Sequence, residues 1–156
     1  MKTKNERRDV PNEVNLSKIF SLFKRQEELV LPSGDSPFNN TELCVISEIY
    51  LAKTQGKRLI STQIAKRLGV TRSAISQTVN HLEARGIVAR VGDEVDRKIA
   101  YIEITEAYET ACEDAVAQAI SYANTILKKF GEEKFERMYK QYEEFIAVVK
   151  QVTEKE

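Results

Sequence analysis

Residues 61–82 read STQIAKRLGVTRSAISQTVNHL, and this stretch decides the fold that the sequence predicts. Gly69 stands where a first helix must end, a position that favours positive φ, and Val70 is expected to fill the corner behind it. Ala65 is small where two helices would cross. We therefore expect a helix-turn-helix over residues 61–86. The apolar residues that support it recur at helical spacing in two segments, Ile64 with Leu68 and then Ile75, Val79 and Leu82.

The second helix carries polar side chains that suit DNA recognition. Its first turn can be capped by Thr71, and the positions opposite its apolar residues share one face. Arginine can fork onto guanine, glutamine or asparagine onto adenine, and serine can reach a base edge or a phosphate. The alternative is an ordinary surface helix, which also turns polar residues outward. The residues expected in the major groove are Thr71, Arg72, Ser73, Ser76, Gln77 and Asn80.

Two β-strands follow, over residues 87–91 and 99–104, joined by a charged loop. A hairpin directly after a recognition helix is a wing, here residues 87–105, and residues 59–60 are expected to add a short third strand. The wing would reach the adjacent minor groove, whose negative potential attracts basic side chains.

Basic residues around the helices and the wing are expected to contact DNA. In the wing, Arg97 or Lys98 would enter the minor groove, while Asp96 orients them by ion pairing. The residues expected on phosphates are Lys66, Arg67, Arg72 and Arg90, which would supply affinity rather than sequence choice.

Three stretches together resemble the MarR (multiple-antibiotic-resistance repressor) family of winged helix-turn-helix regulators. They are residues 64–71 leading into Ser76, residues 82–88, and residues 96–98 with 104–106 behind them. The family's wing usually reads Asp-x-Arg, whereas this chain has Lys98 at the second basic position and Val95 where another Arg is common.

The resemblance implies a repressor that a small aromatic or lipophilic effector releases from DNA. By the same analogy the effector would bind near Phe20, Phe23, Tyr50 and Tyr108, although core packing is the simpler reading of each. Relatives that sense metals use ligand clusters that this sequence lacks, so we expect no metal and no cofactor.

Charge is distributed unevenly, although the net charge of the 156 residues is zero. Residues 57–98 carry nine basic and four acidic groups, while residues 99–156 carry seven basic and twelve acidic groups. A basic centre and an acidic C-terminal arm predict one DNA-facing side.

The composition is that of a cytoplasmic protein, with 42% hydrophobic and 31% charged residues. We expect no membrane span, because no run approaches the ~18 apolar residues that one requires, and no signal peptide. Cys44 and Cys112 are interpreted as buried, unreactive thiols, with a redox-responsive regulator as the alternative.

The whole chain is predicted to be mainly α, with a small β-hairpin wing. Residues 1–12 would form a flexible arm and residues 41–105 the winged helix-turn-helix lobe. A helix beginning at Glu13 and ending near Val30 precedes the lobe, and Asn40 or Thr41 is expected to cap the next one. One continuous helix would connect residues 106–130.

The helices in residues 13–40 and 131–156 are predicted to form a homodimer. Each shows an apolar stripe. A completed lobe cannot hide the stripe of the last helix, and pairing this helix with the first one and with the same two helices of a second copy would bury it. Packing of the last helix within its own chain alone is the alternative. The residues expected at this interface are Leu16, Ile19, Phe20 and Phe23 in the first region and Phe135, Met138, Tyr142, Phe145 and Val149 in the second.

Other function classes are less well supported by the residues. An enzyme would have to work with a single histidine, His81, and without a phosphate-binding glycine loop or a Cys/His metal set. A winged helix that binds protein instead of DNA remains an alternative, and salt-sensitive DNA binding would exclude it. We expect a dimeric DNA-binding regulator on an inverted-repeat operator, with half-sites about 10 base pairs apart.

Overall fold

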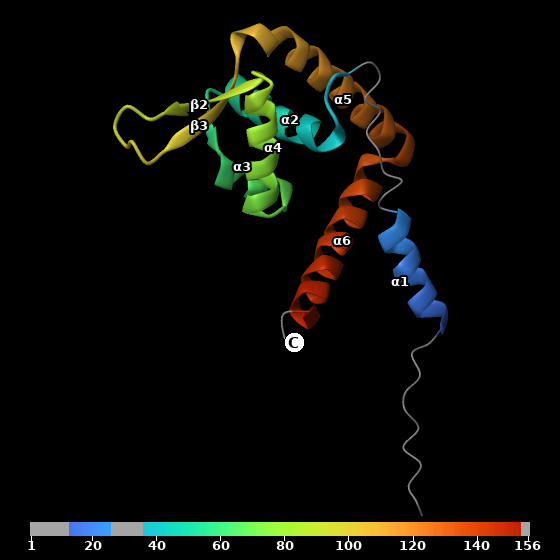
Figure 1. The fold of residues 1–156 in the computed structure, drawn as a ribbon. Coiled ribbons are helices and arrows are strands. Elements are labelled where there is room, and N and C mark those ends of the chain that lie inside the picture. Colours follow the sequence, from blue (N-terminus) through green and yellow to red (C-terminus); the bar gives the residue numbers. More distant parts are fainter. Residues whose placement is uncertain (1–12, 26–35, 154–156) are drawn as a thin grey trace, which may run out of the picture. The chain divides into compact units, whose positions relative to one another are not determined.

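The computed structural model describes residues 13–25 and 36–153, and the chain divides into two units, residues 1–31 and 32–156 (Figure 1). In the first unit, α1 spans Glu13–Arg25. The elements of the second unit are α2 (Asn40–Thr54), β1 (Leu59–Ile60), α3 (Ser61–Leu68), α4 (Arg72–Ala84), β2 (Val88–Gly92), β3 (Ala100–Ile104), the 3-10 turn η2 (Glu106–Tyr108), α5 (Glu109–Phe130) and α6 (Glu132–Thr153). The predicted mainly helical fold with a small wing is confirmed.

Helix α2 begins one residue earlier than expected, because a capping box selects Asn39. The Asn39 side chain accepts a hydrogen bond from the Glu42 backbone N–H (3.0 Å), and the Glu42 carboxylate accepts one from the Asn39 backbone N–H (3.0 Å). The prediction of Asn40 or Thr41 as the cap was wrong. Only Asn39 has a glutamate three residues later that can return the bond.

Helices α3 and α4 form the predicted helix-turn-helix. Gly69 ends α3 with φ +67°, and the Thr71 hydroxyl accepts a hydrogen bond from the Ala74 backbone N–H (3.2 Å) at the start of α4. The prediction that Val70 fills the corner behind Gly69 is wrong, because the Val70 side chain is 46% exposed. It closes the turn through its backbone instead, donating to the Ala65 carbonyl (3.1 Å).

The core of the lobe is apolar and lies where helical spacing predicted it. Phe38 and side chains of α2 pack there with the inner faces of α3, α4 and the sheet. Its fully covered members include Val45, Ile46, Ile64, Ile75, Val79, Leu82, Ile87, Ile102 and Val116, each at most 2% exposed. Burial of this apolar surface is the main stabilisation of the lobe.

The sheet has the strand order β1-β3-β2, and both pairings are antiparallel. Leu59 pairs with Ile102, and Val88 with Ile104. Both wing strands begin one residue later than predicted. The Ile87 N–H donates to the Leu82 carbonyl (3.0 Å), closing α4, and Ile99 exchanges hydrogen bonds with the wing loop.

The predicted continuous helix from Glu106 is wrong in its first turn. Residues 106–108 form η2, in which the Tyr108 N–H donates to the Thr105 carbonyl (3.0 Å). Thr105 is held at the sheet because its hydroxyl donates to the Gly86 carbonyl (2.6 Å), so the chain turns tightly before α5 begins. One side of α5 is then buried through the side chains of Cys112, Ala115 and Val116.

Large apolar side chains on α1 and α6 remain outside any core. In α1, Ile19, Phe20 and Phe23 are 37%, 59% and 43% exposed. In α6 no residue is buried, and Met138 and Tyr142 are 47% and 39% exposed.

Parts of three predictions lie outside the described residues. These are the arm at residues 1–12, the end of the first helix at residues 26–30, and the side chain of Leu16. Of the helices that the structure describes, none combines the length and apolarity needed to cross a membrane.

Candidate nucleic-acid interface

Helix α4 has one covered face and one open face. Ile75, Val79 and Leu82 are at most 1% exposed and hold the helix on the lobe. The residues predicted to meet the major groove are all exposed, namely Thr71, Arg72, Ser73, Ser76, Gln77 and Asn80. The helix therefore presents hydrogen-bonding groups outward in the geometry that base recognition needs.

Asn80 differs from the other residues on this face because it is tied to the wing. The Arg90 guanidinium on β2 donates to Asn80 Oδ1 (2.7 Å) and forms an ion pair with Glu83. Arg90, expected to contact phosphate, thus joins α4 to β2. The amide nitrogen of Asn80 makes no hydrogen bond within the described part of the chain.

The two basic residues of α3 also differ from each other. Arg67 pairs with Glu48 of α2 (3.1 Å), whereas exposed Lys66 has no ion-pair partner among the residues described. Lys66 can therefore reach a phosphate without breaking a contact.

Aspartates order the wing loop through backbone hydrogen bonds. Asp93 Oδ1 accepts from the backbone N–H groups of Val95 and Asp96 (both 2.9 Å), and Asp96 Oδ1 accepts from that of Lys98 (3.0 Å). The hydrogen bonds from Asp96 and Val95 lower the pKa of Asp93. The predicted ion pairing by Asp96 is wrong, because its carboxylate is directed at the backbone instead of at Arg97 or Lys98.

Both predicted groove residues, Arg97 and Lys98, lie exposed on this ordered loop. At the base of the sheet, Arg58 lies over the Tyr101 ring, 4.1 Å from its centroid, and pairs with Glu103. Sequence reasoning missed Asp93, although Asp side chains in turns are known to accept hydrogen bonds from the backbone two residues on.

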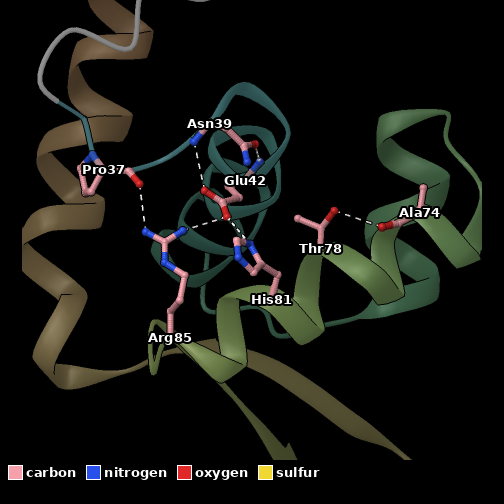
Figure 2. A network of polar contacts seen from close by, with 7 residues as sticks. All are labelled: Pro37, Asn39, Glu42, Ala74, Thr78, His81 and Arg85. Atoms are coloured by element: carbon pink, nitrogen blue, oxygen red, sulfur yellow. Dashed lines mark hydrogen bonds and ion pairs between the residues drawn. The ribbon is translucent and has the colours of Figure 1, made fainter.

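A buried carboxylate connects α2 to α4, and this was also missed (Figure 2). Glu42 is 2% exposed. Its Oε1 lies 2.8 Å from His81 Nδ1 and 2.8 Å from Arg85 Nη1, and Arg85 Nη2 donates to the Pro37 carbonyl (2.9 Å). Burial alone would raise the pKa of Glu42, but the hydrogen bonds from Asn39, Arg85 and His81 outweigh it and leave the pKa below its ordinary value.

The residues suggested for an effector pocket fall in both units of the chain. Tyr50 donates a hydrogen bond to Glu113 Oε1 (3.0 Å), joining α2 to α5, and Tyr108 is half-buried in η2. Phe20 and Phe23 belong to the first unit.

The two cysteines are free. Cys112 is buried, and burial raises the pKa of its thiol to about 11. Cys44 was predicted to be buried but is only half-buried. Its pKa is raised, mainly by burial and also by the negative charge of Glu48. Within residues 13–25 and 36–153, no three His, Cys, Asp or Glu side chains are placed to hold a metal ion.

Residues 37–99, which include the Asn39 cap of α2 and extend through the wing loop, match the family model described as the MarR family. Over this stretch the chain is similar to the MarR family. A curated relative, the transcriptional regulator AdcR of Streptococcus pyogenes serotype M6, is 24% identical over an alignment of 116 residues that covers 72% of this chain and 77% of the relative.

Solved structures share the MarR-family fold. A MarR/EmrR family transcriptional regulator from Acinetobacter sp. ADP1 is 22% identical, with a TM-score of 0.69 over 88% of this chain and 98% of that one. MepR of S. aureus, solved as a complex with DNA, is 19% identical, with a TM-score of 0.62 over 88% and 97% of the two chains. AdcR and the Acinetobacter protein are both transcriptional regulators.

Proposed function

We propose that the protein is a homodimeric repressor that recognises an inverted-repeat operator through α4. The observation that carries this proposal is the division of α4 into an apolar face, buried on the lobe, and an exposed face of hydrogen-bond donors and acceptors. A helix anchored in this way can enter a major groove without exposing apolar surface.

Each residue of α4 that was predicted to meet the major groove has a proposed role. Arg72 and Gln77 read bases, because their side chains can form paired hydrogen bonds to guanine and adenine. Ser73 and Ser76 reach base edges or phosphates. Asn80 donates through its amide nitrogen, while Arg90 holds the amide oxygen and fixes the side chain.

Affinity is proposed to come from basic residues beside α4. Lys66 and Arg67 of α3 would lie along one strand of DNA, and Arg97 or Lys98 would enter the minor groove from the wing. The structure of MepR with DNA, a protein of the same fold, supports the general placement of such a lobe on a duplex.

The dimer is proposed from the uncovered apolar side chains of α1 and α6. A second copy would bury them, and two-fold symmetry would place the two copies of α4 about 34–36 Å apart, in successive major grooves. Release by a small aromatic or lipophilic effector is a further part of the proposal and rests on the family resemblance alone.

The test is a selection of bound sequences from a random duplex pool, followed by titrations of the selected duplex at several salt concentrations. We expect an inverted repeat with half-sites about 10 base pairs apart and affinity that falls by orders of magnitude with added salt. Enrichment of no sequence, together with no salt-sensitive binding, would favour the protein-interaction alternative and reject the proposal.

A further inference from the structure

The side chains around Glu42 join three segments that are distant in sequence (Figure 2). Glu42 lies in the first turn of α2, whereas His81 lies in the last turn of α4 and Arg85 is the C-cap residue that follows it. Arg85 also reaches the Pro37 carbonyl ahead of α2. We call Glu42, His81 and Arg85 the α2–α4 clamp.

The clamp supplies a directional contact that the apolar face of α4 cannot. Contacts of Ile75, Val79 and Leu82 hold the helix on the lobe, but hydrophobic contacts are non-directional and permit small rotations about the helix axis. His81 and Arg85 are four residues apart and therefore share one face. Both meet the same oxygen, Glu42 Oε1, at 2.8 Å, which fixes that face relative to α2.

The fixed face determines where the recognition residues point. Gln77 precedes His81 by four residues, so it lies one turn before the clamp, and Asn80 is the immediate neighbour of His81. A rotation of α4 that displaces His81 must displace both. Thr78, also on this side of the helix, donates within α4 to the Ala74 carbonyl (3.0 Å) and adds no bond to α2.

We propose that Glu42 is a positioning residue for DNA recognition, which sets the rotation of α4 and thereby aligns Gln77 and Asn80 with base edges. This inference rests on the proposed function of α4. Glu42 touches no DNA itself, and it acts through Arg85 and His81. Because base contacts carry sequence choice and phosphate contacts carry general affinity, loss of the clamp reduces specificity more than it reduces binding.

The decisive variant is Glu42→Gln, which keeps the size of the side chain and an amide oxygen for the Asn39 N–H but removes the charge that binds Arg85. We expect affinity for the selected operator to fall about tenfold or more, as when one base contact is lost. Affinity for random-sequence duplex should change by less than about twofold, since it depends on phosphate contacts.

A matched control is Glu109→Gln, which removes the exposed ion pair between α5 and Lys53 of α2. This variant loses one charge of the same type but should keep the ratio of operator to random-sequence affinity. A purely structural role for Glu42 would lower the folded fraction, which would lower both affinities together and leave the ratio unchanged. Circular dichroism at the assay temperature measures that fraction.

A second variant covers the case in which Glu42→Gln does not fold. Arg85→Lys keeps the charge near Glu42 but cannot contact both the carboxylate and the Pro37 carbonyl in the fork geometry. We expect a smaller fall in the ratio and faster amide hydrogen exchange at the C-terminal end of α4. A folded variant of either kind with an unchanged ratio would overturn the proposal. Wild-type protein without any sequence preference would instead reject the proposed function.

Discussion

Single side chains on the open face of α4 are held to different degrees. Asn80 is fixed by Arg90, which forms an ion pair with Glu83, whereas Gln77 has no hydrogen-bond partner within the described residues. A side chain without a partner loses conformational freedom when it binds a base, but it breaks no contact to do so. Gln77 is therefore the residue at which loss of a base contact can be measured most directly.

Replacing Gln77 by Ala should weaken binding to the selected operator by about 1–3 kcal/mol and relax the preference at one base pair. The physical reason is the loss of a bidentate contact to adenine. Competition titrations with operators substituted one position at a time provide the measurement. Gln118→Ala, an exposed glutamine on α5, is the matched control and should bind as wild type. An unaltered preference for the Gln77 variant would remove this residue from the interface.

At the residue scale, spacing predicted which side of α4 is buried, because a helix of known period has only one apolar face. It could not predict that Glu42 is buried, since the reason lies in Arg85, which is 43 residues away. The partners of Arg90 could not be predicted either, because Glu83 and Asn80 lie on α4 and meet Arg90 only when β2 packs beside that helix.

Elements of the lobe depend on turns with particular backbone geometry. Gly69 ends α3 at φ +67°, while Gly92, at the end of β2, has no positive φ, and neither would meet another atom within 4 Å of an added Cβ. Substitutions at Gly69 and Gly92 can therefore distinguish backbone strain from steric crowding, because only Gly69 requires the left-handed region.

Gly69→Ala should lower the free energy of unfolding by about 1–2 kcal/mol, the cost of placing an L side chain in the left-handed region. Denaturant titration followed by circular dichroism measures this difference. Gly92→Ala is the control and should have a much smaller effect. Equal losses at both positions would contradict the assignment of strain to the helix-turn-helix corner.

The wing depends on Asp93 as the acceptor for two backbone N–H groups. Asp93→Ala should loosen the loop that carries Arg97 and Lys98, and operator binding should weaken because a flexible loop must be ordered on DNA. Asp93→Asn keeps an oxygen acceptor and should retain most of the affinity. Fluorescence anisotropy with both variants is the measurement, and a greater loss with Asn than with Ala would refute this role.

At the element scale, the sequence predicted every helix and strand of the lobe, but several boundaries shifted by one residue or one turn. Ile87 and Ile99 carry strand-like side chains, yet their backbone groups bond to α4 and to the wing loop. Residue type does not reveal such competition for hydrogen bonds, so boundaries are harder to predict than elements.

The whole molecule is predicted to be a dimer of 17.8 kDa chains. Light scattering should give about twice that mass, because in the proposed dimer a second copy buries the exposed apolar residues of α1 and α6. The double variant Phe20→Asp with Met138→Asp should shift the mass to that of one chain and weaken operator binding. Val95→Asp, at a wing residue that is 94% exposed, should keep the dimer mass. Wild-type protein with the mass of one chain would contradict the dimer.

Stability of the whole molecule should depend on pH through Glu42. The pKa of Glu42 is lowered in the folded state, so its contribution to stability is present above its unfolded pKa, about 4.3, and is lost as pH falls through the folded pKa. Melting temperatures measured from about pH 6 down to pH 3 should therefore fall less steeply for Glu42→Gln than for wild type. Parallel curves would show that other carboxylates account for acid unfolding.

The central place of β3 in the sheet has a mechanical consequence. β1 runs directly into α3, β2 follows α4, and β3 is hydrogen-bonded to both strands. With α4 held by the α2–α4 clamp, the wing and the two helices therefore translate and rotate together as one rigid body. A hinge inside this body would require broken strand pairing, so in the proposed dimer an effector would change the fit to DNA by changing the separation of the two lobes.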